Sequence, residues 1–340
     1  MLRRRPGTPT LEEVAALAGV GRGTVSRVIN NAAGVKDTTR RAVQRAIAEL
    51  GYVPNLAART LAGRRADAVA LVMTEPDWRQ FGEPFFSEIV RSVGDALTET
   101  EVQLLLTLVR TDAERQRLVE YARGGRVDGV MLMSVHATDP LPDMLAEVGL
   151  PTVLLGRRSG DESVTYVDAD NVGGARAAVA HLLDSGRRAI ATITGPPDMY
   201  VAQCRLRGYR EAMERAGVEA RRSWTVQGDF SAESGYRAMA ELVERAPEID
   251  GVFAASDTMA VGALGALRAA GRGVPDDVAV IGFDDFPLAQ HTDPKLTTVR
   301  QPLEDIGHTM VRLLLEEMEE PSTAWRHVIH RTELVLRDSA

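Results

Sequence analysis

The chain has 340 residues and a net charge of −8, and its content of 44% hydrophobic and 26% charged residues is typical of a globular protein of two or three domains. No apolar run approaches the roughly 18 residues of a membrane span, and no apolar stretch follows the basic N-terminus as in a secretory signal. The single cysteine, Cys204, excludes a disulfide framework and a four-cysteine zinc site and fits a reducing cytoplasm, where we expect the protein.

Charge is distributed unevenly along the chain. Residues 1–66 hold 12 Lys and Arg against 4 Asp and Glu, whereas residues 67–340 hold 28 against 44. This asymmetry predicts that the first part meets a polyanion and the second does not. The alternative is that the arginines only solubilise a flexible end, but several of them, such as Arg27 and Arg45, fall within helical patterns.

Two helices joined by a glycine turn are predicted near the front of the chain. Thr10 and Glu13 have the spacing of a capping box, and apolar residues at helical spacing follow them. Gly19 ends this helix, and the next begins near Gly21–Arg22. Two short helices joined in this way form a helix-turn-helix, whose second helix enters the major groove of DNA.

A third helix completes this first domain, residues 1–54. Thr38 or Thr39 is its expected cap and Gly51 its end. Side chains suited to base edges or phosphate oxygens are Arg27, Asn30, Thr10, Thr24 and Ser26. The glycines at 19, 21 and 23 also resemble a dinucleotide-binding loop, but they follow a helix rather than a strand and lack the G-x-G-x-x-G spacing.

Residues 55–66 predict a hinge helix and linker. Asn55 can cap the weak helix "LAARTLAG", which is too short to persist in water alone and can fold when two copies pack together on DNA. Leu61 has no obvious core to enter and suits a wedge between base pairs in the minor groove. The alternative is that Leu56 and Leu61 only tether the linker.

Strand and helix patterns alternate from residue 67 to 340. The first strands are "DAVALVM", "VQLLLTLV", "VDGVMLM", "PTVLLG" and "VTYVDAD", with helices at 85–100 and 112–124. The second strands are "AIATITG", "SWTVQGDF", "GVFAASD" and "VAVIGFDD", with helices at 172–185, 203–217, 231–245 and 257–271.

This alternation predicts an α/β body of two doubly wound parallel-sheet subdomains. We place one at about 67–168 with 299–326 and the other at about 169–298 with 327–340. The crevice between them, at the carboxyl ends of the strands, is the expected ligand site.

Polar residues lie where the second set of strands ends. Ser256 and Asp257 follow one strand, Asp284 follows another, and Arg205 lies at the start of a helix. Carboxylates and arginines make paired hydrogen bonds to neighbouring sugar hydroxyls, so these residues predict a sugar site. Each has a structural alternative: Asp257 is equally suited to a helix N-cap, Asp284 to a turn and Arg205 to a salt bridge.

An aromatic ring is expected to cover the C–H face of the sugar. Candidates for this ring are Phe230, Trp78, Phe81, Phe85 and Phe86. Phe81 lies in a predicted loop and is a better candidate than Phe85 and Phe86. Phe85 and Phe86 are better explained by helix packing.

No catalytic motif competes with a binding function. The sequence has no G-x-S-x-G, H-E-x-x-H or P-loop pattern. His327 and His330 lie in "HVIHRTELVL", which predicts a strand rather than a metal site. We therefore expect no cofactor, no metal and no enzyme, although Asp257 and Asp284 can imitate the paired carboxylates of a sugar-active enzyme.

The stretches "TVSRVIN" and "GYVPNLAARTL" are highly specific and resemble the DNA-binding head and hinge of the lactose-repressor (LacI/GalR) family. The resemblance continues through the body and covers nearly the whole chain. It implies that Arg22 and Gly23 occupy the main base-reading positions, and that Arg27 also faces the groove. Contacts to the DNA backbone are implied for Thr10, Thr24, Ser26 and Asn30, and hinge contacts for Asn55, Ala58 and Leu61.

The head departs from the family pattern at two positions. Gly21 stands where relatives often have Ser, and it is a weaker but acceptable cap. Gly23 stands where relatives usually have a side chain that reads a base. Base reading therefore shifts onto Arg22, whose guanidinium best fits a guanine edge.

For the body, the resemblance implies a periplasmic sugar-binding fold. Arg205 and Asp284 match effector contacts, Phe230 matches a ring that packs on the sugar, and Ser256 matches a polar contact. The stretches "GVGRGTVSRVIN" and "DMYVAQCRLRGYREAM" are moreover similar to cellobiose-responsive repressors of high-GC Gram-positive bacteria.

The expected function is that of a homodimeric repressor of sugar-utilisation genes on a pseudo-palindromic operator. Cellobiose or a related β-glucoside would change the angle between the subdomains, separate the hinge helices and release the DNA. A maltose-type sugar or a co-repressor response stays open. A free sugar-binding sensor is the alternative from another class, and the absence of a heptad-repeat tail favours a dimer over a tetramer.

Overall fold

A computed structural model describes residues 9–29, 32–52, 65–74, 84–322 and 324–340. The chain divides into two compact units, Met1–Ala66 and Asp67–Ala340. Within the described ranges, no helix combines the length and the apolar character needed to cross a membrane.

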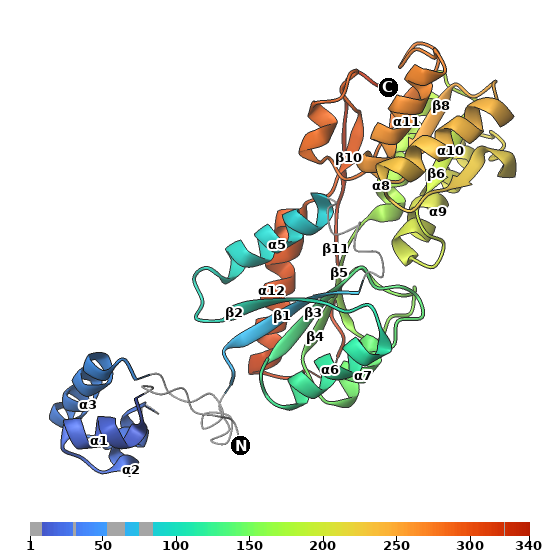
Figure 1. The fold of residues 1–340 in the computed structure, drawn as a ribbon. Helices are drawn as coiled ribbons and strands as arrows, with labels where there is room; N and C mark the ends of the chain where they lie inside the picture. The colour runs from blue at the N-terminus through green and yellow to red at the C-terminus, as the bar shows by residue number, and fades with distance from the viewer. Residues whose placement is uncertain (1–8, 30–31, 53–64, 75–83, 323) are drawn as a thin grey trace. The chain divides into compact units, whose positions relative to one another are not determined.

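The first unit contains the three helices that the sequence predicts, α1 (Leu11–Ala18), α2 (Arg22–Ile29) and α3 (Asp37–Leu50) (Figure 1). The capping box is present: Oγ1 of Thr10 accepts from the Glu13 amide at 3.1 Å, and the Glu13 carboxylate accepts from the Thr10 amide at 2.7 Å. Gly19 and Gly51 end α1 and α3 in the left-handed conformation, with φ of 66° and 62°.

The cap predicted for α3 is wrong. The helix already begins at Asp37, so Thr38 and Thr39 lie inside its first turn, and Lys36 at the N-cap position makes no side-chain cap bond. Asp37 compensates, since a carboxylate in the first turn is stabilised by the helix dipole. The core of this unit is small and depends on Val14, Val25 and Val43, all fully buried.

The second unit begins with a six-stranded parallel sheet in the order β11-β5-β4-β3-β1-β2. Its strands are β1 (Ala68–Met73), β2 (Gln103–Leu108), β3 (Gly129–Met133), β4 (Thr152–Leu155), β5 (Thr165–Ala169) and β11 (His327–His330). Its helices are α5 (Pro84–Leu97), α6 (Asp112–Arg123), α7 (Leu141–Glu147) and α12 (Leu303–Glu319). Figure 1 shows α5 and α12 on one face of the sheet and α6 and α7 on the other, as a doubly wound sheet requires.

A four-stranded parallel sheet follows in the order β7-β6-β8-β9. Its strands are β6 (Ile190–Thr194), β7 (Thr225–Gln227), β8 (Gly251–Ala254) and β9 (Ala279–Ile281), and its helices are α8 (Asn171–Asp184), α9 (Tyr200–Arg215), α10 (Ala232–Arg245) and α11 (Asp257–Ala269). Short 3-10 helices occupy Arg222–Trp224 and Pro287–Gln290. Successive strand residues alternate between two cores: Ile190 packs with α8 and α9, whereas Ala191 packs with α10 and α11.

The segment "HVIHRTELVL" is not one strand. β11 runs parallel to β5 in the first sheet, and β12 (Glu333–Val335) pairs antiparallel with β10 (Thr298–Arg300). Our placement of 327–340 entirely in the second subdomain is therefore wrong for β11. The physical reason is pairing with a distant strand, in which the His327 ring stacks on Tyr166 with 4.2 Å between ring centroids.

Candidate functional site

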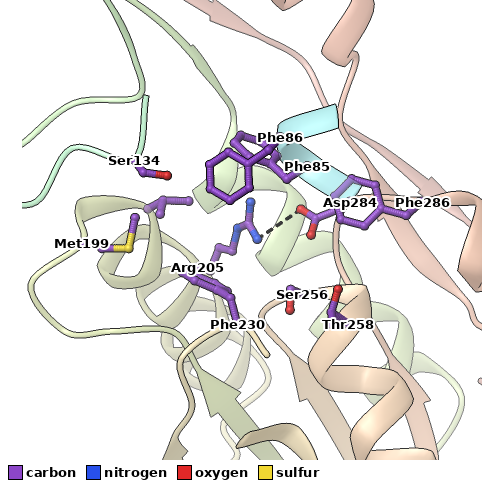
Figure 2. Close-up of a pocket in the computed structure, with 11 residues that line it drawn as sticks. Phe85, Phe86, Ser134, Met199, Arg205, Phe230, Ser256, Thr258, Asp284 and Phe286 are labelled. Carbon is purple, nitrogen blue, oxygen red and sulfur yellow. Dashed lines mark ion pairs between the residues drawn. The ribbon is translucent and has the colours of Figure 1, made fainter. Parts of the chain in front are cut away.

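A cavity lies beyond the carboxyl ends of the strands, between residues of the two subdomains. This is the position that the doubly wound topology predicts for a ligand. Its lining combines four phenylalanines with a few polar groups, and consists of Phe85, Phe86, Ser134, Met199, Val201, Arg205, Phe230, Ser256, Thr258, Asp284 and Phe286 (Figure 2).

Arg205 on α9 is the central polar group of this cavity. Its Nη1 lies 3.3 Å from Oδ1 of Asp284 and donates to the Ala255 carbonyl at 2.5 Å, while Nε donates to Oδ1 of Asn171 at 2.9 Å. The guanidinium also lies 3.7 Å from the centre of the Phe283 ring. Only 4% of Arg205 is exposed, so these contacts fix its orientation toward the cavity.

Asp284 follows β9 and faces Arg205, as Figure 2 shows. Its Oδ1 also accepts from Nε2 of Gln301 at 2.7 Å. Burial raises the pKa of Asp284 to about 6, although the nearby Arg205 opposes this shift. The carboxylate is therefore ionised at neutral pH and is protonated in mild acid.

Backbone strain is concentrated around the cavity. Ser134, Phe230 and Asp284 have positive φ values of 58°, 70° and 119°, a region that L-residues rarely adopt. Such strain persists only where the surrounding structure enforces it, and it clusters at ligand sites. A Cβ on Gly195 would overlap the Phe230 ring, so a glycine at position 195 makes room for that ring.

Two further predicted effector residues, Ser256 and Phe230, line the cavity. Ser256 lines the cavity, but its Oγ also accepts from the Met259 amide at 3.2 Å as the N-cap of α11. Phe230 lines the cavity opposite the aromatic residues of α5. Phe81 lies outside the described residues.

Asp257 does not line the cavity. It is fully buried at the start of α11, where Oδ2 accepts from the Phe286 amide at 2.9 Å and Oδ1 accepts from Oγ1 of Thr298. The structure therefore supports the structural alternative for Asp257 and corrects its inclusion among the effector contacts. Among described residues lining this cavity, Asp284 is the only carboxylate.

Phe85 and Phe86 line the cavity, contrary to our preference for packing alone. Phe86 both lines the cavity and packs in the core. It is 5% exposed and meets Phe85 edge-on, with 5.8 Å between ring centroids. Ser134, Met199 and Thr258 also line the cavity and were not among the residues predicted from the sequence. Ser134 had a usable signal, because it directly follows strand β3 at the carboxyl edge of its sheet.

A second hollow adjoins the first and shares Arg205, Met199 and Ser134 with it. It adds Arg157 and Asp168 to the polar lining. Nε of Arg157 donates to Asp168 at 3.2 Å, and Asp168 accepts from Nδ2 of Asn171 at 2.9 Å. Since Asn171 also accepts from Arg205, a continuous polar chain spans both hollows.

The first unit presents a separate basic surface on α2. Arg22 and Gly23 are exposed at the start of α2, and Nη1 of Arg22 lies 2.9 Å from Oε1 of Glu12. Arg27 is also exposed and donates from Nη2 to the Ala33 carbonyl at 3.1 Å. Thr24 and Ser26 are partly buried.

The other predicted DNA contacts divide into two groups. Thr10 is the N-cap of α1, so its hydroxyl lies at the N-terminal end of that helix, where it accepts from the Glu13 amide. The predicted contacts Asn30, Asn55, Ala58 and Leu61 lie outside the described residues.

Two protein-family models match the chain. Residues 10–55 match the model described as "Bacterial regulatory proteins, lacI family", and residues 179–340 match the model described as "Periplasmic binding protein-like domain". The HTH-type transcriptional regulator CelR of Thermobifida fusca is 52% identical over 341 residues, which cover 100% of both chains.

Two solved structures are similar over almost the full length. A complex of the transcriptional regulator CelR with cellobiose is 50% identical, with a TM-score of 0.78, and the match covers 98% of this chain and 100% of that chain. The lac repressor dimer bound to operator and the anti-inducer ONPF is 27% identical, with a TM-score of 0.86, and the match covers 98% and 99%.

Proposed function

The chain belongs to the lacI family of bacterial regulatory proteins, and on this premise we propose that it represses sugar-utilisation genes and is released from its operator by cellobiose or a related β-glucoside. The observation that carries the proposal is the buried Arg205–Asp284 pair, which faces a cavity walled by Phe230 and two phenylalanines of α5. An arginine and a carboxylate held in this way bind neighbouring hydroxyls, and the rings cover the apolar face of a sugar.

Cellobiose is preferred over other sugars because a CelR–cellobiose complex is 50% identical to this chain over 98% of its length. The adjoining second hollow adds the polar groups of Arg157 and Asp168, which can bind the hydroxyls of a second sugar ring. The relatives are transcriptional regulators, so we propose a DNA-binding regulator without enzymatic activity that acts in the cytoplasm, where bacterial DNA is found.

In the proposed mechanism, two copies of the chain bind a pseudo-palindromic operator, as the operator-bound lac repressor dimer supports. Domain roles follow the boundaries expected from the sequence: 1–54 binds DNA, 55–66 forms the hinge, and 67–340 binds the effector and dimerises. The effector stabilises one arrangement of the two subdomains, which changes the separation of the hinge segments and the fit of Leu61 in the minor groove.

We expect saturating cellobiose to weaken operator binding by about 5–150-fold, the usual range of allosteric coupling. Linkage requires the operator to weaken cellobiose binding by the same factor. Fluorescence anisotropy with a labelled operator, and calorimetry with cellobiose in the presence and absence of operator, measure both factors. Operator affinity that is unchanged by cellobiose contradicts the inducer role, and affinity that increases shows a co-repressor instead.

A truncated chain provides the matched control for this experiment. Asp67–Ala340 is a compact unit with its own cores, so removal of residues 1–66 should leave cellobiose binding intact and abolish operator binding. A thermal-shift screen of mono- and disaccharides on this truncated chain identifies the sugar independently, because a ligand of the native state raises its melting temperature. If a maltose-type sugar gives the largest shift, the maltose-type alternative is favoured over cellobiose.

Cellobiose affinity should fall as the pH is lowered from 7.5 to 5. Because burial raises the pKa of Asp284 to about 6, the carboxylate is ionised above that pH and protonated below it. Protonation removes an acceptor for the sugar and weakens the pair with Arg205, so the affinity at pH 5 should be up to about tenfold lower. Calorimetry at constant ionic strength tests this, and an Asp284→Asn variant should bind weakly without this pH dependence. Affinity that is flat or rises in acid contradicts the role of Asp284.

A further inference from the structure

The loop that carries Asp284 is held by its neighbour, Asp285. Both residues have positive φ, 119° and 59°, so two consecutive L-residues occupy a strained conformation. Asp284 needs this conformation to direct its carboxylate toward Arg205. The Asp284 amide donates to the Val299 carbonyl at 2.7 Å, which fixes one side of the loop but not the strain at Asp285.

Asp285 is not among the described residues that line the effector cavity, and its side chain is bound by two arginines. Only 4% of this side chain is exposed. Nε of Arg300, on β10, donates to Oδ2 at 2.7 Å, and Nη2 of Arg337, just after β12, donates to Oδ1. Both carboxylate oxygens are therefore engaged by cations from two paired strands.

The two arginines are not equivalent. Arg300 is 49% exposed in its side chain and also pairs with Glu333 at 3.2 Å, so solvent weakens its hold on Asp285. Arg337 is 12% exposed, donates from Nη1 to the Leu296 carbonyl at 2.7 Å, and its amide donates to Oγ1 of Thr297 at 2.9 Å. It is the more firmly fixed of the two and the better anchor for the loop.

We propose that Arg337 is a positioning residue of the effector site, which acts through Asp285 to hold Asp284 in the orientation that faces Arg205 and the cavity. The expected change in cellobiose affinity rests on the proposed sugar-binding function. The expected change in the mobility of the loop that carries Asp284 does not. Arg337 is not among the described residues that line either hollow, and its contact with Asp285 links it to the neighbouring Asp284. A side chain far along the chain, near its carboxyl end, therefore contributes to effector affinity.

The test compares full-length Arg337→Met with Arg337→Lys, Asp285→Asn and the double variant Asp285→Asn/Arg337→Met. Arg312→Met is the control, because Arg312 is an exposed arginine that pairs only with Glu316 among the contacts described, at 3.0 Å on α12. Calorimetry measures the Kd for cellobiose, and hydrogen exchange measures amide opening in residues 282–288. Thermal melting without ligand shows whether each variant is folded.

We expect Arg337→Met to weaken cellobiose binding by about tenfold, the scale of losing a support of a ligand-binding group, and to accelerate exchange in 282–288. Arg337→Lys should restore most of the affinity because it returns the cation. In the Asp285→Asn background, Arg337→Met should add little, because two residues that act as one unit are not additive. Arg312→Met should match the wild type.

Two results overturn the inference. One is a folded Arg337→Met protein with wild-type affinity and exchange. The other is an equal loss from Arg337→Met in the wild-type and Asp285→Asn backgrounds, which places its effect at the Leu296 carbonyl instead.

If Arg337→Met does not fold, Asp285→Asn tests the inference in its place. In that variant Arg300 keeps its pair with Glu333, and Arg337 keeps its bond to the Leu296 carbonyl. Wild-type cellobiose affinity and wild-type exchange in Asp285→Asn also overturn the inference. A wild-type chain that does not bind cellobiose rejects the proposed effector, while the exchange of 282–288 still tests the positioning role.

Discussion

Replacement of Arg205 by methionine is expected to abolish the response to cellobiose while operator binding in the absence of sugar persists. The guanidinium makes its contacts from a site that is 4% exposed, and it is the cation that faces Asp284. Removing one partner of a desolvated hydrogen-bonded pair costs about 2–5 kcal/mol of binding, so the Kd for cellobiose should rise by at least about 30-fold. Without Arg205, Asp284 also loses the charge that opposes its raised pKa.

Calorimetry and operator anisotropy with increasing cellobiose measure this effect. Arg207→Met is the matched control, since Arg207 lies two residues away on α9, has a side chain that is 54% exposed and only approaches Glu211 at 3.8 Å. If Arg205→Met does not fold, the double variant Arg205→Met/Asp284→Asn removes both charges together. A folded variant that responds to cellobiose with wild-type affinity shows that Arg205 has a structural role only.

Replacement of Arg22 by alanine is expected to reduce operator affinity strongly and to relax specificity at one base pair in each half-site. Arg22 begins α2 and is exposed, and Gly23 beside it has no side chain, so we propose that Arg22 carries the direct reading at this end of the helix. A bidentate arginine–guanine contact is worth about 1–3 kcal/mol, which gives about 2–6 kcal/mol for a dimer on two half-sites.

Stability should change little in this variant. The only described partner of Arg22 is Glu12, the two side chains are 69% and 55% exposed, and exposed ion pairs contribute about 0–1 kcal/mol. Operator DNA selected from a random pool, its single-base variants and a scrambled duplex give the specificity ratio by anisotropy at fixed salt. Arg45→Ala, an exposed arginine on α3, should leave that ratio unchanged. An Arg22→Ala protein with the wild-type ratio shows that another residue reads the operator.

Local signals explain why the N-terminal unit could be predicted well. The Thr10–Glu13 capping box and the glycine at position 19 act within one helical turn, so neighbouring residues decide them. The cap of α3 was predicted wrongly because Asp37, Thr38 and Thr39 are all able to start a helix, and the neighbouring residues do not distinguish among them.

The effector site was predictable in its residue types but not in its geometry. Asp284 and Phe230 follow strands, so the parallel topology brings them to one edge, and Arg205 reaches them from inside α9, which begins at Tyr200 and not at 203 as expected. The role of Asp257 was open, because its carboxylate binds Thr298, 41 residues away in the sequence. Phe85 and Phe86 were assigned to packing, because helical periodicity cannot show that the surface they cover is also a cavity wall.

The sequence by itself determined the class of this protein: a basic helix-turn-helix on an acidic α/β body, with the residue types of a sugar site. These features follow from short-range patterns, namely caps, glycines, strand–helix alternation and charge. Tertiary structure alone decided that β11 joins the first sheet, that Asp257 is buried, and that Arg337 reaches Asp285. Each depends on a contact between segments far apart in the chain, and such contacts are selected by the whole fold rather than by the residues on either side.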